Sequence, residues 1–435
     1  MSNIDLSPIF QHTLDLLENS SEHLFITGRA GTGKSTLLTH FKKNTEQNIV
    51  VLAPTGVAAV NVGGATIHSF FGFKPDITLE KAWSLGGKTK KPDLYKNLST
   101  LVIDEISMVR ADLLDCIDAF LRRVCLSSRP FGGKRLVLFG DLYQLPPVVS
   151  REEEGIFRAR YTSPFFFSAD VMSRIGLTYI ELDHIYRQRD EEFIEVLNAL
   201  REGSLTTPHL DLLNTRVSPD YAPPPEEMII NLTGTNRTAE TYNTYQLHSL
   251  TGKTHSFSAI STGKFDHRTE PAPRELTLKI GAQVMLTCND REKRFVNGTV
   301  GRVEEIGYAN SLPVVSVRLA NNKLVDVSPN TWEMFNFSYN DRTGRIKSDV
   351  AGTYTQLPIM LAWAITIHKA QGKTFDRVII DLPQSFAHGQ TYVALSRATS
   401  LSGVYLRREL TPGHVIMDPV VTTWLTLIRQ TSIIL

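Results

Sequence analysis

The chain has 435 residues, of which 42% are apolar, 9% aromatic and 21% charged. This composition excludes a disordered, collagen-like or coiled-coil protein, and the length predicts about two to three domains. Forty-six Lys and Arg residues against 45 Asp and Glu residues give a net charge of +1. Such a balance excludes a uniformly basic nucleic-acid-binding surface, so any contact with DNA has to be a local groove.

The sequence also indicates where the chain works. It has no apolar run of about 18 residues, so we expect neither a membrane span nor a membrane partner. It begins with Met1-Ser-Asn-Ile-Asp-Leu, which lacks the basic and apolar regions of a secretion signal and predicts a cytoplasmic location. The three cysteines are odd in number and lack metal-ligand spacing, so we expect reduced thiols at Cys116, Cys125 and Cys288.

In the first third of the chain, short apolar runs alternate with helical patterns. Apolar runs of this length suit parallel strands that are buried on both faces, and we expect such strands at 24–26, 49–52, 101–103 and 136–139. Between the last two runs, apolar residues from Leu113 to Val124 recur at helical spacing. The first third is therefore predicted to be an α/β domain.

A second α/β layer is predicted from the runs at 228–232, 378–381 and 404–406. Short strands with turns between them, as at 281–286, 298–303 and 314–319, predict a small β-barrel inserted within this layer. We expect a first domain at 1–175 with a lysine-rich insertion at about 72–96, a second domain at 176–251 and 351–435, and the inserted barrel at 252–350. The lysines of the first insertion also fit an ordinary solvated loop.

A phosphate-binding loop is predicted at Gly28-Arg-Ala-Gly-Thr-Gly-Lys-Ser35. It follows a predicted strand and precedes an amphipathic stretch, which is the context that distinguishes a P-loop from an ordinary glycine-rich turn. Backbone N–H groups of such a loop and the N-terminus of the following helix bind phosphate oxygens. Lys34 reaches the β- and γ-phosphates of ATP, and Ser35 can bind Mg²⁺. The expected ATP-binding residues are Gly28, Ala30, Gly31, Thr32, Gly33, Lys34, Ser35 and Thr36.

Asp104 and Glu105 follow the third apolar run. An acid at the end of a buried strand can hold Mg²⁺, and a neighbouring glutamate can orient the attacking water. Alone, this pair is also common at helix starts, but together with the P-loop it predicts ATP hydrolysis.

The remaining motifs resemble those of superfamily 1 helicases, in particular the petite-integration-frequency (PIF) family of DNA helicases of bacterial or phage type. In the first third, the resemblance rests on five segments: 53–59, 64–71, 104–108, 129–133 and 140–147. Further along, it rests on 182–188, 366–372 and 392–397. It covers nearly the whole chain, from about Gln11 to Tyr405.

The resemblance implies two RecA-like domains, a wedge insertion in the first, an SH3-like β-barrel in the second, and 5′-to-3′ travel on single-stranded DNA. It places Gln144, Arg187 and Arg397 at the γ-phosphate and Gly372 at the nucleotide. It implies DNA contacts by Pro54, Thr55, Gly56, His68, Ser69, Phe70, Thr366, His368 and Lys369.

Several of these residues have a structural alternative. Gln11 lies 17 residues before Gly28, near where helicases place an adenine-reading glutamine, but the usual neighbours of that glutamine are missing. His68 and His368 also fit capping or core positions. Phe70 and Phe71 fit either base stacking or an ordinary core.

The sequence therefore predicts an ATP- and Mg²⁺-dependent helicase that acts as a monomer on single-stranded and tailed duplex DNA. G-quadruplex and RNA–DNA hybrid are further candidate substrates. A RecD-like or relaxase-associated helicase is the alternative within the same chemistry. An alternative from another class is a nucleotide-gated DNA-binding ATPase that moves no strand.

Overall fold

Six strands of the N-terminal half form one parallel sheet, in the order β3-β2-β4-β5-β1-β6. The apolar runs of β1, β2, β4 and β5 are buried, which confirms the four strands expected in the first third. The strands are β1 (His23–Gly28), β2 (Ile49–Ala53), β3 (Ala65–Thr66), β4 (Thr100–Ile103), β5 (Arg135–Phe139) and β6 (Leu177–Leu182).

The computed structural model describes residues 7–184, 186, 188, 190–263, 265, 270–290, 292–382 and 387–431. Contacts divide the chain into two compact units. The first unit consists of 1–186, 334–351 and 418–435, and the second of 187–333 and 352–417.

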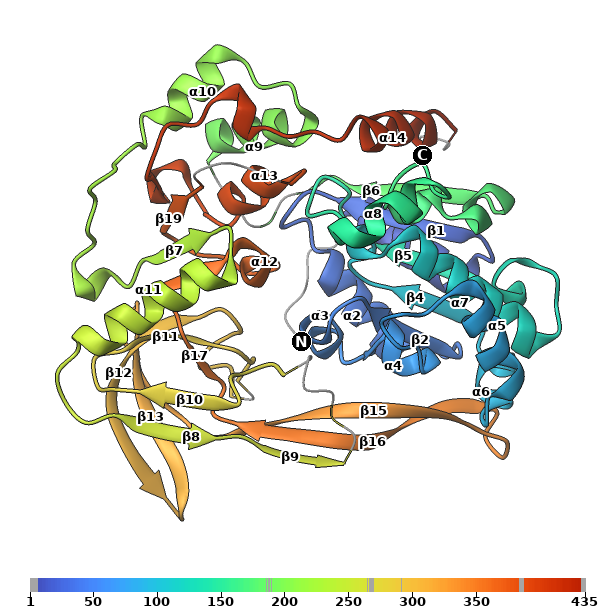
Figure 1. The fold of residues 1–435 in the computed structure, drawn as a ribbon, viewed down its shortest axis with the longest axis horizontal. Helices are drawn as coiled ribbons and strands as arrows, with labels where there is room; N and C mark the ends of the chain where they lie inside the picture. Colours follow the sequence, from blue (N-terminus) through green and yellow to red (C-terminus); the bar gives the residue numbers. More distant parts are fainter. Residues whose placement is uncertain are drawn as a thin grey trace. The chain divides into compact units, whose positions relative to one another are not determined.

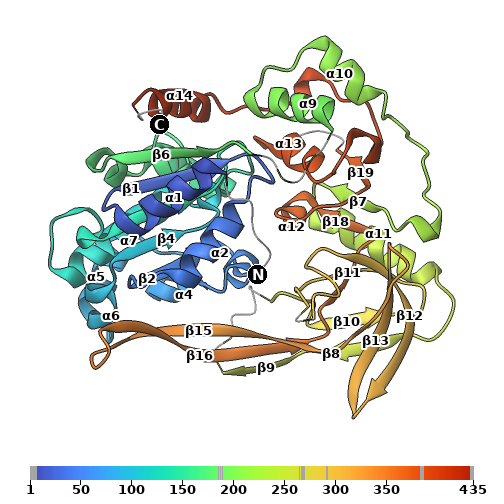
Figure 2. The same cartoon turned by 180° about the vertical axis from the view of Figure 1, so that it is seen from behind.

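Helices cover both faces of the first unit's sheet (Figures 1 and 2). On one face, Phe10 and Leu17 of α1 and Leu37 and Phe41 of α2 form a core with Phe139 and other strand residues. On the other face lies α7, whose expected apolar stripe is buried. The helices of this unit are α1 (Pro8–Asn19), α2 (Lys34–Asn44), α3 (Gly56–Asn61), α4 (Ile67–Phe71), α5 (Leu79–Lys88), α6 (Pro92–Asn97), α7 (Ala111–Cys125), α8 (Arg151–Arg158) and α14 (Pro419–Thr431).

The segment Arg129-Pro-Phe-Gly-Gly133, which carries part of the family resemblance, packs against α7. Phe131 is fully buried, and its backbone N–H donates to the carboxylate of Asp118 at 2.7 Å. At Gly132, where φ is +64°, a Cβ would lie 2.7 Å from the carbonyl oxygen of Leu121. This close approach requires glycine. It allows the segment to pack tightly on α7, the helix that covers one face of the sheet.

The lysine-rich insertion contains two helices, α5 and α6, instead of an irregular loop. α5 packs closely on α7, because a Cβ at Gly86 would lie 2.7 Å from the carbonyl oxygen of Phe120. The guanidinium of Arg123 on α7 lies 5.6 Å from the ring centre of Trp83 on α5. The insertion is therefore a packed element whose lysines remain on its surface.

The second unit contains a parallel sheet with the order β18-β7-β19-β20. Three of these strands confirm the runs expected at 228–232, 378–381 and 404–406. The strands are β7 (Ile230–Thr233), β18 (Ala364–Thr366), β19 (Val378–Asp381) and β20 (Val404–Leu406). The helices of this unit are α9 (Glu191–Glu202), α10 (Thr207–Asn214), α11 (Asn236–Ser249), α12 (Ile367–Ala370) and α13 (Gln390–Leu395).

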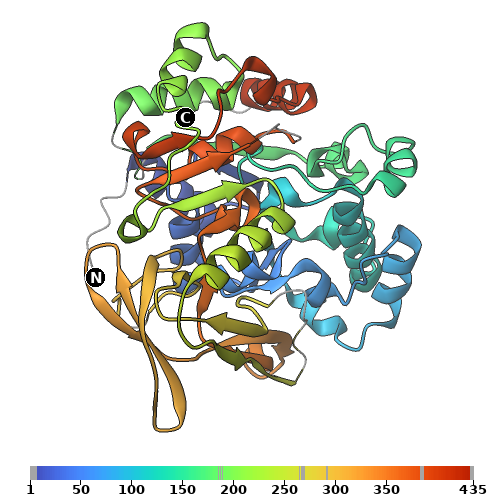
Figure 3. The same cartoon turned by 60° about the vertical axis from the view of Figure 1, so that its left-hand side comes forward.

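Antiparallel strands follow α11 and form three further sheets. The largest has the order β14-β13-β12-β11-β17, and its hairpin β12–β13 projects as a long ribbon (Figure 3). The others have the orders β10-β8 and β15-β16-β9. The strands are β8 (His255–Ser258), β9 (Ile260–Gly263), β10 (Glu275–Leu278), β11 (Gln283–Leu286), β12 (Val300–Ala309), β13 (Leu312–Leu319), β14 (Leu324–Val327), β15 (Asn330–Asn340), β16 (Arg345–Gln356) and β17 (Ile359–Leu361).

The compact units differ from the domain boundaries expected from the sequence. β6 pairs with β1 along six residues, so the first unit continues beyond residue 175. The outer part of the β15–β16 hairpin, 334–351, also lies in the first unit, where Asn48 binds the backbone of Gly344 and Ile346. The ring of Trp424 on α14 stacks on Phe167 at 4.6 Å, which places the C-terminal helix there as well.

In the part of the chain that the structure describes, every helix is too short or too polar to cross a membrane.

Arg135 fixes the end of α1 to β5. Its guanidinium donates to the carbonyl oxygens of Leu16, Leu17 and Glu22 at 2.7–2.8 Å, and the side chain is buried. Replacing Arg135 by Leu leaves these carbonyls without their donor. We expect urea unfolding to show a loss of about 2–4 kcal/mol. Arg158→Leu, which removes an exposed ion pair with Glu154, is the control and should change stability by less than about 0.5 kcal/mol.

Candidate active site

The carboxyl ends of three neighbouring strands meet at one edge of the first unit's sheet. β4, β5 and β1 are adjacent and parallel, so the segments after Ile103, Phe139 and Gly28 leave the sheet on the same side. A Cβ at Gly140 would lie 2.8 Å from Cγ2 of Ile106. The segment after β5 is thus held directly against the segment after β4.

The P-loop joins β1 to α2 at this edge. Gly31 and Gly33 have φ of +88° and +87°, and Gly33 is the N-cap of α2. These left-handed conformations favour glycine and turn the chain so that α2 begins at Lys34. The N-terminus of α2 therefore directs backbone N–H groups and a positive dipole toward phosphate oxygens.

Lys34 and Thr32 are held within the loop. The amine of Lys34 donates to the carbonyl oxygens of Gly28 at 2.6 Å and Arg29 at 3.0 Å. The hydroxyl of Thr32 donates to Arg29 as well, at 2.9 Å. Gly28 is needed at the start, because its Cβ would lie 2.6 Å from the Thr32 hydroxyl. The amine of Lys34 is therefore held at a point where phosphate oxygens could accept its hydrogen bonds in place of these two carbonyl oxygens.

Asp104 is buried at the end of β4, and its backbone N–H donates to the carbonyl of Leu52 at 2.8 Å. Burial raises the pKa of its carboxyl well above the ordinary value, and the charge of Glu105 raises it further, while Lys34 acts in the opposite direction. A carboxylate in such surroundings is stabilised by a divalent cation.

The residues present fit Mg²⁺ bound together with a nucleotide. Asp104 and the exposed Ser35 supply oxygen ligands, the type that Mg²⁺ prefers. Among the described residues, no group of three or more His, Cys, Asp or Glu side chains could hold a metal by itself. The other ligands would be phosphate oxygens and water, as is usual for this ion.

Gln144 lies in the segment after β5, with only 7% of its surface exposed. Its amide donates to the carboxylate of Asp141 at 3.3 Å, and its backbone N–H donates to the carbonyl of Asp141. The loop fixes this glutamine at the same edge as Asp104 and Glu105. The structure thus brings together the P-loop, both acids and Gln144.

Tyr186 is a residue that the sequence prediction missed. Its N–H donates to the carbonyl of Gly31 at 3.0 Å, and its half-exposed ring lies 3.6 Å from the Cβ position of Gly33. The ring of Phe10 approaches the same position at 3.8 Å, so the start of α1 lies beside the P-loop. Gln11 is exposed there, one residue further along the helix. The sequence signal for Tyr186 was its place within the segment 182–188.

Arg397 and Gly372 belong to the second unit. Arg397 is 1% exposed, and its guanidinium donates to the carbonyls of Val393 and Lys373 and to the hydroxyl of Ser396. Gln188 donates to the carbonyls of Ser396 and Ala398, a link that the sequence prediction also missed. Gly372 follows α12 with φ of +77°. Arg187 lies outside the described residues.

The same local structure occurs once in each parallel sheet. Short strands end in Thr66 and Thr366, and each threonine caps a short helix that continues Ile-His. The hydroxyls of Thr66 and Thr366 accept hydrogen bonds from the N–H groups of Ser69 and Lys369. Ser69, His368 and Lys369 are exposed, and His68 is partly exposed. Each sheet therefore presents a polar turn at its carboxyl edge, and the turn of the second sheet carries the cation of Lys369.

The expected contacts at 54–56 form the start of α3. The hydroxyl of Thr55 accepts a hydrogen bond from the N–H of Ala58 at 3.3 Å, Gly56 is buried, and Pro54 is partly exposed. The side chain of Thr55 is thus an N-cap, and the surface offered here is the beginning of a helix.

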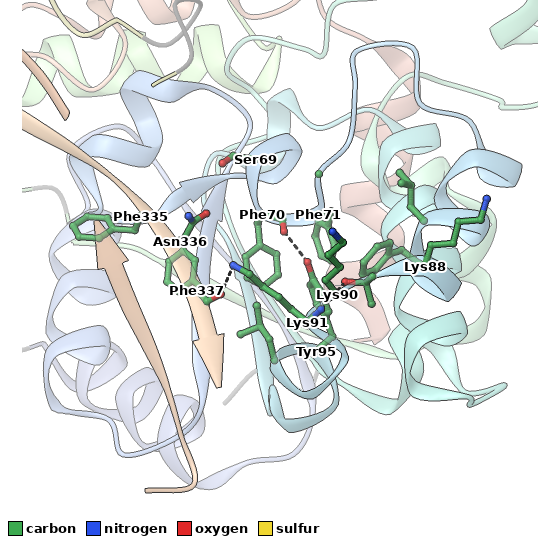
Figure 4. A pocket seen from close by; sticks show the side chains of 15 residues that line it. Ser69, Phe70, Phe71, Lys88, Lys90, Lys91, Tyr95, Phe335, Asn336 and Phe337 are labelled. Atoms are coloured by element: carbon green, nitrogen blue, oxygen red, sulfur yellow. Dashed lines mark hydrogen bonds between the residues drawn. The ribbon is translucent and has the colours of Figure 1, made fainter. Parts of the chain in front are cut away.

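Phe70 lies in an aromatic cluster beside a cavity of about 290 Å³ (Figure 4). It is 7% exposed and makes edge contacts with Phe71, Tyr95 and Phe337 at 4.9–5.6 Å. Lys91 donates to the carbonyl of Phe337 at 3.0 Å, which ties the insertion to β15. In this arrangement the ring of Phe70 packs as core.

Comparison with known proteins agrees with this geometry. A family model described as PIF1-like helicase matches residues 3–210, and one described as UvrD-like helicase C-terminal domain matches 361–405. The chain is 34% identical to ATP-dependent DNA helicase Pif1 of Bdellovibrio bacteriovorus, over 96% of this chain and 90% of the relative.

Two solved structures of Bacteroides Pif1 are similar over nearly the whole chain. The complex with ADP-AlF4 has a TM-score of 0.89 at 35% identity and covers 98% of this chain and 97% of that one. The protein bound to ssDNA has a TM-score of 0.68 at 34% identity and covers 98% and 97%. The α/β fold with parallel sheets matches these helicases, and the chain belongs to the PIF1-like helicase family.

Proposed function

We propose that the chain is an ATP-dependent DNA helicase that translocates 5′ to 3′ on single-stranded DNA and unwinds duplex or structured DNA. The observation that carries this proposal is the edge of the first sheet, where the P-loop, Asp104, Glu105 and Gln144 converge. Membership of the family supports the DNA substrate and the direction.

In the proposed reaction, the P-loop N–H groups and Lys34 bind and orient the β- and γ-phosphates of ATP. Mg²⁺, held by Ser35 and Asp104, supplies charge neutralisation at the phosphates when it is bound. Glu105 orients the attacking water and accepts its proton, and Gln144 senses the γ-phosphate. A guanidinium stabilises the charge that spreads over the transferred phosphoryl group, and we assign this role to Arg187 and Arg397. Gln11 and Tyr186 are the proposed contacts of the adenine.

The proposed DNA contacts are the two Thr-Ile-His turns, around Thr66 and Thr366, together with the start of α3 at 54–56. The exposed hydroxyl of Ser69 and the exposed amine of Lys369 suit phosphate oxygens, which carry no base identity. A translocating enzyme needs contacts of this kind, because each step along the strand meets a different sequence.

We assign the two parallel-sheet regions to the RecA-like domains, α5 and α6 to the wedge insertion, and the β11–β14 sheet to an SH3-like barrel. We expect the protein to work as a monomer in the cytoplasm of a bacterium or phage-infected cell, at the nucleoid. Tailed duplexes are its expected substrates, with G-quadruplexes and RNA–DNA hybrids as further candidates.

Replacing Lys34 by Ala removes the ammonium that binds the β- and γ-phosphates. We expect the steady-state ATPase rate with DNA present to fall by about 10²-fold or more. Lys43 on the same helix is exposed, and Lys43→Ala should stay within about twofold of the wild type. An active Lys34→Ala protein would contradict the assignment of the ATP site.

Strand displacement tests the motor on two duplexes that differ only in a 5′ or a 3′ single-stranded tail. With ATP and Mg²⁺, we expect unwinding of the 5′-tailed duplex alone, and none by Lys34→Ala. Unwinding from the 3′ tail would overturn the direction. ATPase activity that ignores DNA, without displacement of either strand, would favour a nucleotide-gated binding protein.

A variant of Lys369 tests the proposed DNA contacts, which we call the DNA track. Replacing it by Ala removes one phosphate contact, so we expect weaker binding of an oligo(dT) strand and a salt dependence reduced by about one unit in slope. Fluorescence anisotropy across a salt series measures both quantities. Lys323, on the turn between β13 and β14, is exposed and outside the track, so Lys323→Ala is the matched control. An unchanged slope in Lys369→Ala would remove this residue from the DNA contacts.

A further inference from the structure

A half-buried lysine in the second unit connects two parts of the chain that are far apart in the sequence. Lys373 directly follows the turn at Gly372, and its amine donates to the side-chain oxygen of Asn297 at 2.6 Å. Asn297 lies in the loop 287–299, which joins β11 to β12. Burial lowers the pKa of Lys373 to about 8, in agreement with an amine enclosed by the protein.

The stem of Lys373 packs on the backbone of the same loop. At Gly298, where φ is +99°, a Cβ would lie 3.3 Å from Cβ of Lys373 and 3.4 Å from its Cγ and Cδ. Any larger residue at 298 would therefore press on the lysine stem, in a backbone conformation that already favours glycine. Lys373 therefore contacts the loop both along its aliphatic side chain and at its amine.

The backbone of Lys373 holds the arginine of the proposed ATP site. Its carbonyl accepts a hydrogen bond from the guanidinium of Arg397 at 3.2 Å. The neighbouring backbones are also paired, because Phe375 donates to the carbonyl of Arg397 and Thr399 donates to the carbonyl of Phe375. A displacement of Arg397 would therefore move Lys373 as well.

The loop 287–299, which the structure describes except at residue 291, combines buried anchors with exposed side chains. Phe295 is buried in the core of the β11–β14 sheet and anchors the loop, and Asp290 binds the guanidinium and N–H of Arg294. Lys293, between Asp290 and Phe295, is exposed, and Val296, directly after Phe295, is 62% exposed. An exposed lysine suits a phosphate oxygen of a nucleic-acid backbone.

We propose that Lys373 is a positioning residue that couples Arg397 to the loop 287–299, so that nucleotide binding changes the grip of this loop on DNA. This inference rests on the proposed function. It depends on two hydrogen bonds of Lys373, one at its backbone carbonyl and one at its amine, and on the packing of its side chain against Gly298. Coupling between sites needs a continuous chain of fixed contacts, and Lys373 supplies one within a single residue.

The test measures how nucleotide binding changes the affinity for DNA, instead of the rate of ATP hydrolysis. The dissociation constant of an oligo(dT) strand is determined with and without ADP and aluminium fluoride, and the ratio of the two constants measures the coupling. We expect Lys373→Met and Asn297→Ala to bring this ratio at least about fivefold closer to one, because coupling energies of this kind correspond to factors of 5 or more. Without nucleotide, the DNA binding of Lys373→Met should stay within about twofold of the wild type.

Three further variants separate coupling from simple packing. The double variant Lys373→Met with Asn297→Ala should lose no more coupling than either single one, because both remove the same contact. Lys373→Arg keeps a donor of similar reach and should restore part of the ratio. Lys323→Met, an exposed lysine near the end of the same sheet, should leave the ratio unchanged.

A wild-type ratio in Lys373→Met would overturn the inference, as would a parallel loss of DNA binding with and without nucleotide. The proposed function has a separate criterion, namely unwinding of a 5′-tailed duplex by the wild type. A wild-type protein that unwinds DNA with unchanged coupling in Lys373→Met would refute only the relay. A wild-type protein that does not unwind would refute the helicase.

Discussion

Parallel strand pairing is the constraint on which the candidate site depends. Because β4, β5 and β1 run in the same direction and in register, their carboxyl ends lie at one edge, and residues as far apart as Gly28, Asp104 and Gln144 meet there. Backbone hydrogen bonds set these positions, and close approaches refine them. Gly140 brings the segment after β5 within contact of Ile106, a spacing that no side chain with a Cβ would allow. The low polarity that buries Asp104 also raises the pKa of its carboxyl, which makes a bound cation favourable at this point.

The second unit repeats the same arrangement in its own sheet. Thr366 ends β18 as Thr66 ends β3, and the hydroxyl of each threonine caps a short helix. In both turns, the threonine caps the helix, the isoleucine is buried and the histidine lies at the surface. Each parallel sheet therefore ends in a turn that is stabilised in the same way.

Several motif residues have a structural role that the tertiary contacts show. Phe131 and Gly132 fix a turn against α7, and the side-chain oxygen of Thr55 caps the start of α3. Phe70 is enclosed by other rings. A sequence motif marks a conformation as well as a chemistry, and burial shows which of the two a residue serves. Lys373 illustrates the converse, because it stands next to a motif glycine and yet connects through its side chain to a loop 76 residues earlier in the chain.

The sequence by itself determined four strands of the first parallel sheet and three of the second, the apolar stripe of α7, and the P-loop with Asp104 and Glu105. These features depend on hydrophobic periodicity and turn chemistry, which act over a few residues. Only the tertiary structure decided that β6 belongs to the first sheet and that 334–351 and α14 pack in the first unit. It also revealed Tyr186 over Gly33 and the link from Lys373 to Asn297. Such contacts join residues tens to hundreds of positions apart, and they form because buried surface and close backbone approach favour them, which no local pattern encodes.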